Sequence, residues 1–254
     1  MAIAVFGDIH GNLEALEAII KHIKKNRKIK QAYFLGDAIT FGPDSSACLK
    51  LLAKNPWIKC VVGNHEQRMV RYDRSVSTMT YAGAKHMEYI FHSLDNDDLR
   101  FIKTMPTECK INYKGFNVLF THYSHDEHGV VRDDYEEFTE AQLHKLFGDK
   151  NCNVTFFAHI HSRKVIIDEH GKSYICNGSS GCVKCDKTFY TYFDVEDSLG
   201  EDPNFSIYRV SVRFNRKRFE EKMLTQPIPE KIQFAKYCFG MYLDEEPKLP
   251  NCNK

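Results

Sequence analysis

Residues 3–12, IAVFGDIHGN, join a short apolar run to residues that are typical of a binding site. The run Ile3–Phe6 predicts a buried β-strand. Gly7 allows the backbone to turn tightly after that strand. The spacing of two in Asp8-Ile9-His10 puts both polar side chains on the same side of an extended segment. We therefore expect this strand end to present a carboxylate and an imidazole to one ligand.

The same unit recurs further along the chain. Each time, a candidate strand is followed at once by side chains that commonly bind metal ions: Ala32–Leu35 leads to Asp37, Cys60–Val62 to Asn64 and His65, Asn117–Phe120 to His122, and Asn153–Ala158 to His159 and His161. Ligands of α/β sheets bind outside the carboxyl ends of the strands. We therefore expect these side chains to meet at one edge of the fold, and a series of five is hard to obtain by chance.

Seven of these residues are candidate metal ligands: Asp8, His10, Asp37, Asn64, His122, His159 and His161. They are too many for one tetrahedral ion, but enough for two ions if one carboxylate bridges them. A donor set of imidazoles and oxygens without thiolate suits Mn, Fe, Zn, Ni or Co rather than Ca. We expect two divalent metal ions, with their identity left open.

The composition narrows the class of protein. Lys and Arg number 35 against 34 Asp and Glu in 254 residues, a net charge of +1. This balance argues against a general nucleic-acid or membrane-surface binder and leaves local basic patches open. No apolar run is long enough to span a membrane. The first residues run into a candidate core strand and have no charged region or small-residue cleavage site, so we expect no signal peptide. The nine cysteines are scattered, and we expect reduced thiols and a cytoplasmic location.

Apolar runs and amphipathic stretches alternate along the chain, as in an α/β fold. Further strand candidates are Lys110–Tyr113, Lys164–Asp168, Lys172–Ile175, Thr188–Asp194 and Phe205–Val212, with hairpin turns at Lys114-Gly115 and near Gly171. A first helix is expected where Leu16, Ile19, Ile20 and Ile23 recur at helical spacing. Further helices are expected near Ser46–Lys54, within about 66–106 as a cap-like insertion, and as a pair within about 215–244. We expect a single domain over residues 1–254.

Taken together, several segments resemble the calcineurin-like metallophosphoesterase superfamily: Gly7–Asn12, Gly36-Asp37, Gly63–Glu66, His122 and His159–His161. Other stretches resemble its small bacterial and archaeal phosphodiesterase-type branch: Gly36–Pro43, Leu94–Pro106, Gly178–Gly181 and Tyr208–Val210. The resemblance implies an α/β fold in which two mixed β-sheets pack as a sandwich with helices on the outer faces.

The resemblance also implies roles for the residues. Asp8, His10 and His161 would bind the first metal ion, Asn64, His122 and His159 the second, and Asp37 would bridge both. His65 would stand beside the ions as the general acid for the leaving group. The expected activity is hydrolysis of phosphodiester or phosphomonoester bonds by a hydroxide shared between the two ions.

Two positions depart from the pattern of the branch. Ala158 replaces the glycine that usually precedes the first histidine of the last motif, and Glu66 stands where the branch more often has aspartate. Glutamate is usual in protein phosphatases and dinucleoside-polyphosphate hydrolases, which remain alternative activities. Those enzymes carry an Asp-Arg-Gly in the second motif, whereas this chain has Thr40-Phe41-Gly42. A further alternative is a non-enzymatic scaffold, although all seven ligand positions and His65 are present.

Other features have simpler interpretations. His125 follows His122 at a spacing of three and is a candidate substrate contact, as is Lys184 after the Gly178–Gly181 turn. Cys182 and Cys185 lack a second pair of zinc ligands, so we interpret them as ordinary reduced cysteines. The expected partner is a phosphate-ester small molecule or nucleotide. Nucleic acid is a weaker alternative, because a nuclease needs a basic, aromatic-lined groove, and self-association is left open.

Overall fold

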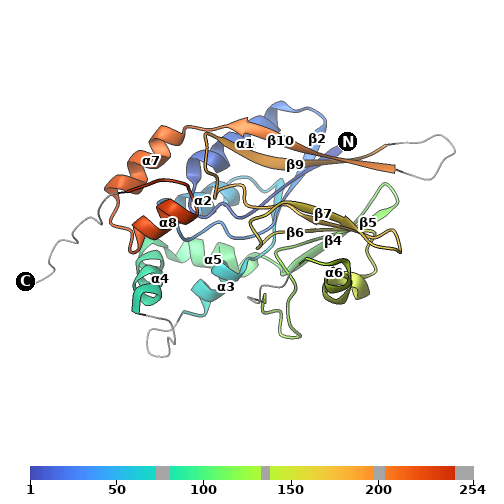
Figure 1. The fold of residues 1–254 in the computed structure, drawn as a ribbon, viewed down its shortest axis with the longest axis horizontal. Helices are drawn as coiled ribbons and strands as arrows, with labels where there is room; N and C mark the ends of the chain where they lie inside the picture. The colour runs from blue at the N-terminus through green and yellow to red at the C-terminus, as the bar shows by residue number, and fades with distance from the viewer. Residues whose placement is uncertain (73–80, 133–137, 197–203, 244–254) are drawn as a thin grey trace, which may run out of the picture.

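A computed structural model describes residues 1–72, 81–132, 138–196 and 204–243 of the chain. The described residues form two five-stranded β-sheets (Figure 1). Both sheets are mixed, since each contains parallel and antiparallel pairs.

The first sheet has the strand order β10-β9-β1-β2-β3. Its strands are β1 (Ala2–Phe6), β2 (Ile29–Phe34), β3 (Ile58–Cys60), β9 (Lys187–Glu196) and β10 (Asn204–Arg213). β1, β2 and β3 run parallel, so their carboxyl ends lie at the same edge. β9 is antiparallel to β1, and its amino-terminal end therefore reaches that edge as well.

The second sheet has the order β4-β5-β6-β8-β7. Its strands are β4 (Glu108–Tyr113), β5 (Phe116–Thr121), β6 (Val154–Phe157), β7 (Lys164–Ile167) and β8 (Ser173–Cys176). β5, β6 and β8 are parallel. The hairpin partners β4 and β7 lie antiparallel at the two outer positions.

The inner faces of the two sheets pack against each other. Their buried side chains alternate along each strand, as the period of two requires: Ile3, Val5, Tyr33, Leu35 and Val61 come from the first sheet and its strand ends, and Val118, Phe120, Val154, Phe156 and Ile175 come from the second. The rings of Tyr33 and Phe120 stack across this interface with centroids 3.7 Å apart.

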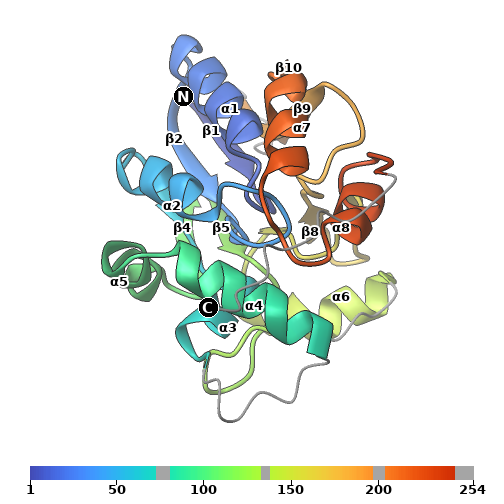
Figure 2. The same cartoon turned by 90° about the vertical axis from the view of Figure 1, so that its left-hand side faces the viewer.

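Helices cover the outer faces. α1 (Leu13–Lys25), α2 (Ser45–Ala53), α4 (Tyr81–Ser93) and α5 (Asn96–Thr104) contribute to the core on the outer side of the first sheet, and α6 (Glu140–Phe147) packs on the second sheet. In Figure 2, α1, α2 and α5 follow one another along one side, while α7 (Arg216–Thr225) and α8 (Lys231–Tyr237) lie on the other. α3 (Asn64–Val70) and a short 3-10 turn, Gly148–Lys150, complete the helices.

The start of α1 shows how sequence sets local structure near the first motif. The side chain of Asn12 caps the helix by accepting a hydrogen bond from the amide of Ala15. Its amide group donates to the carbonyl of Gly181, 2.9 Å away. Leu16, Ile19 and Ile23 then recur at helical spacing and are buried. One residue therefore joins the helix start to a turn far away in the sequence.

The sandwich of two mixed sheets with outer helices confirms the expected fold. Both predicted hairpins are present, as is the pair of helices after residue 215. The third strand is an exception, because it ends at Cys60 rather than Val62. Val61 and Val62 are buried although they lie beyond the strand, and burial rather than pairing explains their apolar character. In the described part of the chain, no helix combines the length and apolar character that a membrane span needs.

Candidate metal centre

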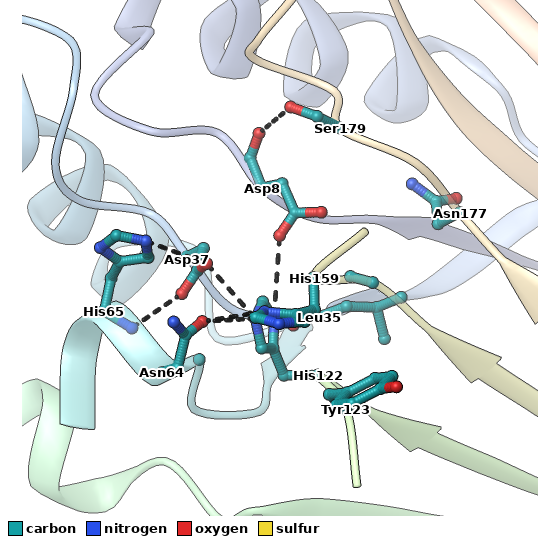
Figure 3. A network of polar contacts seen from close by, with 12 residues as sticks. Asp8, Leu35, Asp37, Asn64, His65, His122, Tyr123, His159, Asn177 and Ser179 are labelled. Atoms are coloured by element: carbon teal, nitrogen blue, oxygen red, sulfur yellow. Dashed lines mark hydrogen bonds and ion pairs between the residues drawn. The ribbon is translucent and has the colours of Figure 1, made fainter. Parts of the chain in front are cut away.

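Five strand ends meet where the two sheets face each other. Asp8, Asp37 and Asn64 follow β1, β2 and β3 of the first sheet, whereas His122 and His159 follow β5 and β6 of the second. Figure 3 shows these side chains converging from both sheets. His10 and His161 lie two residues beyond Asp8 and His159. The site therefore lies between two sheets. From the strand ends alone we expected it at the edge of one sheet.

Asp37 lies between two groups of candidate ligands. One group joins it to His10 and His65, and the other joins it to His122 and His159; within each group the candidate ligand atoms lie within 4.8 Å of one another. Its Oδ2 is 3.3 Å from Nε2 of His122 and 3.8 Å from Nε2 of His10. This carboxylate is shared by both groups.

Electrostatics favour the charged form of Asp37. Burial acts to raise the pKa of its carboxyl, but the charges of His122 and His65 outweigh burial and hold that pKa well below its ordinary value. Conversely, burial acts to lower the pKa of His122, and the charge of Asp37 reverses this and raises the pKa to about 9. The negative field that attracts a proton to His122 would equally attract a metal cation.

The imidazole of His122 is held in a fixed orientation. Its Nδ1 donates a hydrogen bond to the carbonyl of Leu35 at 2.7 Å. Its Nε2 lies 2.9 Å from Oδ1 of Asn64, and the same oxygen is 3.3 Å from Nδ1 of His159. A backbone carbonyl that fixes one ring nitrogen leaves the other free for a metal ion. The donor atoms of Asn64, His122 and His159 thus lie close together.

His10 also belongs to a third set of candidate ligands, with His161 and Cys182. Nδ1 of His10 donates to the carbonyl of Ile39, while its Nε2 lies 3.0 Å from Nε2 of His161. Burial, with the nearby ring of His161, lowers the pKa of His10 well below its ordinary value. Neutral imidazoles whose nitrogen atoms approach each other this closely can bind a cation between them.

Cys182 is close to His10 and His161. Its Sγ lies within 4.8 Å of the ligand atoms of His10 and His161, so a sulfur atom adjoins a donor set that was expected to lack one. Cys185, by contrast, is exposed, and its Sγ lies 3.7 Å from the carbonyl oxygen of Lys187. Both cysteines line the pocket beside His161, but only Cys182 approaches the candidate ligand atoms.

Asp8 supplies a direct test of whether the site fits a metal ion. Its side chain is fully buried, and neither carboxylate oxygen has a hydrogen-bond partner. Burial raises the pKa of this carboxyl well above its ordinary value. The ring of His122 approaches as an ion-pair partner, with Nδ1 3.8 Å from Oδ1, but it donates no hydrogen bond to Asp8. A buried carboxylate without hydrogen bonds is strongly unfavourable unless it coordinates a cation or takes up a proton. The donor set therefore fits a divalent ion.

Glu66 organises the loop that carries Asp37. Its Oε2 accepts hydrogen bonds from the amides of Asp37 and Gly63 at 2.8 and 3.0 Å, and its Oε1 accepts from Ala38 at 2.7 Å and from Ile39 at 3.3 Å. Burial and the charge of Asp37 raise the pKa of Glu66 to about 7. The glutamate is long enough to reach four amides of two motifs at once, which explains how the fold accommodates this departure.

The backbone of the site is strained. Asp8, His10, Asp37 and His159 have φ angles of +50°, +48°, +59° and +70°. Residues other than glycine avoid this left-handed region, and each such residue costs about 1–3 kcal/mol. The surrounding hydrogen bonds hold these conformations, and four of the seven expected ligands need them. Such clustering of strain is typical of functional sites.

His65 stands beside Asp37 at the start of α3. Its backbone amide donates to Oδ1 of Asp37 at 3.1 Å, and its Nε2 lies 3.9 Å from Oδ2 (Figure 3). On the other side of the ring, Nδ1 is 3.0 Å from the hydroxyl of Thr40. Thr40 therefore orients the ring so that Nε2 faces the ligand groups.

The turn after β8 closes the site from above the first motif. The hydroxyl of Ser179 donates to the carbonyl of Asp8 at 2.7 Å, and the amide of Gly181 donates to the same carbonyl at 3.0 Å. Figure 3 shows Ser179 beside Asp8.

Ala158, which replaces a glycine, is fully buried in the inner core and donates its amide hydrogen to the carbonyl of His122 at 2.8 Å. Its methyl group fits where it stands.

The two candidate substrate contacts lie in different places. Nε2 of His125 is 3.1 Å from Oε2 of Glu108 on β4, so this ring is held by a carboxylate outside the ligand groups. Lys184 is exposed and lines a pocket that also includes His161.

The sequence did not predict the parts played by Glu66, Thr40 and Ser179. Each acts through contacts with distant residues, which no local pattern reveals.

Comparison with known proteins shows the family of the chain. The sequence model described as calcineurin-like phosphoesterase matches residues 1–163, which include all seven expected ligands and His65. The chain belongs to the calcineurin-like phosphoesterase family. This family generally uses divalent metal ions, in line with the buried and unpaired carboxylate of Asp8.

Three similar proteins extend the comparison. The uncharacterized protein MJ0912 of Methanocaldococcus jannaschii is 28% identical over 246 residues, 90% of this chain and 94% of that protein. The asymmetrical bis(5'-nucleosyl)-tetraphosphatase PrpE of Oceanobacillus iheyensis is 28% identical over 168 residues, which cover 59% of this chain and 65% of that enzyme. The crystal structure of a metallophosphoesterase from Sphaerobacter thermophilus matches with a TM-score of 0.67 at 18% identity, covering 94% of this chain and 98% of that one. This structural match supports the fold.

Proposed function

We propose that this family member is a phosphoesterase that holds two divalent metal ions and hydrolyses phosphodiester or phosphomonoester bonds. The observation that carries the proposal is the position of Asp37. Its carboxylate belongs at once to a group with His10 and to a group with His122 and His159. A single shared carboxylate between two donor groups is the arrangement that a pair of ions requires.

The proposed ligands divide between the two groups. Asp8, His10 and His161 would hold one ion, Asn64, His122 and His159 would hold the other, and Asp37 would bridge both. The unpaired oxygens of Asp8 support its role, and the fixed rings of His10 and His122 support theirs. When bound, the two ions would neutralise charge on the phosphoryl group and make water acidic enough to attack at neutral pH.

His65 is the proposed general acid. Its Nδ1 contacts the hydroxyl of Thr40, and its Nε2 faces the shared carboxylate of Asp37. An ester oxygen bound next to Asp37 would lie within reach of Nε2, which can donate a proton to the departing alkoxide. Imidazole suits this step because its ordinary pKa lies near neutral pH.

The decisive experiment combines metal analysis with a His65→Ala variant. The full chain is loaded with Mn²⁺, Ni²⁺, Co²⁺ or Zn²⁺ and tested on mono-, di- and cyclic phosphate esters. His65→Ala should keep its metal content but lose about 10²–10⁴-fold in turnover of esters with poor leaving groups. His92→Ala is a matched control, because the His92 side chain is 63% exposed on α4. Absence of bound metal and of activity with all four ions would overturn the proposal in favour of a non-enzymatic scaffold.

Hydrolysis of dinucleoside polyphosphates is a second candidate. The similarity to the tetraphosphatase PrpE favours it, as does the glutamate at position 66. The second motif supports neither this candidate nor the protein-phosphatase alternative, because Thr40-Phe41-Gly42 stands where both classes carry Asp-Arg-Gly. Comparing turnover of diadenosine tetraphosphate with that of a phosphoserine peptide would separate the two alternatives.

A further inference from the structure

A pocket of about 350 Å³ adjoins the metal centre on the side of His161. Four cationic side chains line it: Arg163, Lys184, Lys187 and Arg209. No aspartate or glutamate is among its lining residues in the described part of the chain. We call these four residues and the space between them the cationic pocket. Because His161 lines it too, the pocket opens directly beside a proposed metal ligand.

The four cations come from separate elements of the fold. Arg163 precedes β7, Lys184 follows the Gly178–Gly181 turn, Lys187 begins β9, and Arg209 lies on β10. The amino-terminal end of β9 lies at the same edge as the carboxyl end of β1. Positive charges from different parts of the sequence thus converge next to the site, although the net charge of the chain is only +1.

These charges are not neutralised by the protein. Within the described ranges, none of the four forms an ion pair with a carboxylate, whereas nearby Arg213 is paired with Asp186 at 2.8 Å. Like charges gathered in one concave site repel one another and raise the local concentration of anions. Such an arrangement is favourable when an anion occupies it.

Arg209 is held in place for this task. Its Cζ lies 3.6 Å from the centre of the Phe189 ring, a close cation–π contact. Phe189 is itself 5% exposed, so the guanidinium rests on a buried platform. Burial and the charge of Arg163 also lower the pKa of Arg209. A stacked guanidinium keeps its N–H groups available for a phosphate.

We propose that the cationic pocket binds a second phosphate group of a substrate whose scissile phosphate lies at the metal centre. The substrate class is therefore a small ester with two or more linked phosphates, such as a nucleoside polyphosphate. This inference rests on the proposed function and narrows it. Guanidinium and ammonium groups bind phosphate through charge-assisted hydrogen bonds, which are stronger than neutral ones.

The size and lining of the pocket favour a small polyphosphate over a nucleic-acid strand. Non-specific binding of single strands uses exposed aromatic rings on which bases stack. Phe189 is buried, and Arg209 covers its face. The pocket therefore offers charge without a stacking surface, which suits a phosphate group rather than a base.

The test compares a bisphosphonate with a monophosphonate as ligands of the Mn²⁺-loaded full chain. Methylenediphosphonate and methylphosphonate are titrated by calorimetry and also assayed as competitive inhibitors of a chromogenic phosphate ester. We expect the bisphosphonate to bind at least tenfold more tightly. Arg209→Gln and Arg163→Gln should each weaken its binding about tenfold or more, as expected for loss of a charge-assisted hydrogen bond, and leave the monophosphonate unchanged.

Arg213→Gln is the matched control, because Arg213 lies on the same strand as Arg209 but pairs with Asp186 outside the pocket. It should leave both ligands unaffected. Equal affinity for the two ligands, an equal effect of Arg213→Gln, or preference for a single-stranded oligonucleotide would each overturn the inference. If esters are hydrolysed but one of these outcomes appears, the proposed phosphoesterase function is retained and the second phosphate site is rejected. If nothing is hydrolysed, the calorimetric comparison still decides whether the cationic pocket binds linked phosphates.

Discussion

Oδ1 of Asp8 lies 3.8 Å from Nδ1 of His122, yet the two side chains share no hydrogen bond. Nδ1 instead donates to the carbonyl of Leu35 at 2.7 Å. The contact between the sheets thus brings a buried carboxylate next to an imidazole whose nearer nitrogen is already used. The charge of His122 acts to lower the pKa of Asp8, but burial outweighs it and raises that pKa. The charged form of Asp8 is therefore unfavourable without a cation, and the residue is sensitive to metal and pH.

Replacing Asp8 by asparagine should stabilise the metal-free protein. The change removes a buried carboxylate that accepts no hydrogen bond, which we expect to raise the free energy of unfolding by about 1–3 kcal/mol near pH 8. Urea unfolding of chelator-treated samples measures this. With Mn²⁺ added, the order should reverse, because the wild type gains stability from binding and the variant loses a ligand. A variant that is less stable in both conditions would contradict this account.

Asp8 should contribute a stability to the metal-free wild type that falls as pH rises. Burial raises the pKa of Asp8 well above its ordinary value of 3.8, so the folded state holds the proton more tightly than the unfolded state. The resulting contribution is complete below that ordinary pKa and is lost as pH rises through the raised one. The free energy of unfolding of chelator-treated protein is measured from about pH 4 to pH 8. Asp8→Asn should lack the decrease with rising pH that Asp8 contributes in the wild type. Identical slopes would exclude Asp8 as the cause.

Glu66→Gln should weaken the loop of the second motif. A glutamine has one acceptor oxygen where the carboxylate serves the amides of Gly63, Asp37, Ala38 and Ile39. Each buried donor left unpaired costs about 1–3 kcal/mol. Urea unfolding at about pH 8, above the pKa of about 7, measures the loss in the ionised state. Glu17→Gln on the exposed side of α1 is the control, and equal stability of the two variants would contradict the role of Glu66.

Strand ends were predictable because their signals are local. An apolar run before glycine and a polar residue marks both a buried strand and its end, and the positions after β1, β2, β5 and β6 carry their polar residues to one place as expected. The hairpin at Lys114-Gly115 is equally local. The family resemblance supplied the division into two sheets, which periodicity alone does not contain.

Contacts between distant residues were not predictable in this way. The antiparallel pairing of β9 with β1 joins Thr191 to Val5, and no local pattern records that partnership. Two further long-range contacts are the approach of Cys182 to His10 and the hydrogen bond from Ser179 to the carbonyl of Asp8. The cationic pocket is hidden for the same reason, because its charges come from four separate elements. Lys184 alone was noticed, from its place after a turn.

Thr40→Val should reduce turnover while preserving the metal centre. Valine keeps the shape of threonine but removes the hydroxyl 3.0 Å from Nδ1 of His65. Nδ1 of His10 also lies 3.2 Å from this hydroxyl, but it keeps its hydrogen bond to the carbonyl of Ile39 at 3.1 Å. Metal content should therefore change little. We expect about a tenfold fall in kcat with poor leaving groups and little change with good ones, because proton donation matters only for the former. Thr104→Val, on the surface of α5, is the control. An equal loss with every leaving group would contradict a positioning role.

Gly181→Ala should damage the fold more than an alanine at another glycine. A Cβ at residue 181 would lie 1.9 Å from the carbonyl oxygen of Ile9, so the turn after β8 must move away from the first motif. Gly115 provides the comparison: its φ is +91°, and nothing lies within 4 Å of the place that a methyl group would take, so alanine there costs only the left-handed strain of about 1–2 kcal/mol. We expect Gly181→Ala to lower the free energy of unfolding by more than Gly115→Ala.

The same substitution should also reach the metal centre, because Gly181 and Ser179 both bind the carbonyl of Asp8. Displacing the turn releases Asp8 from its strained φ of +50° and moves its carboxylate away from the other donors. Gly181→Ala should therefore bind Mn²⁺ more weakly than the wild type, whereas Gly115→Ala, at the far hairpin, should bind it normally. Metal titration by calorimetry at a temperature where both variants are folded separates this effect from unfolding. Normal metal affinity in folded Gly181→Ala would show that the turn supports the fold without shaping the site.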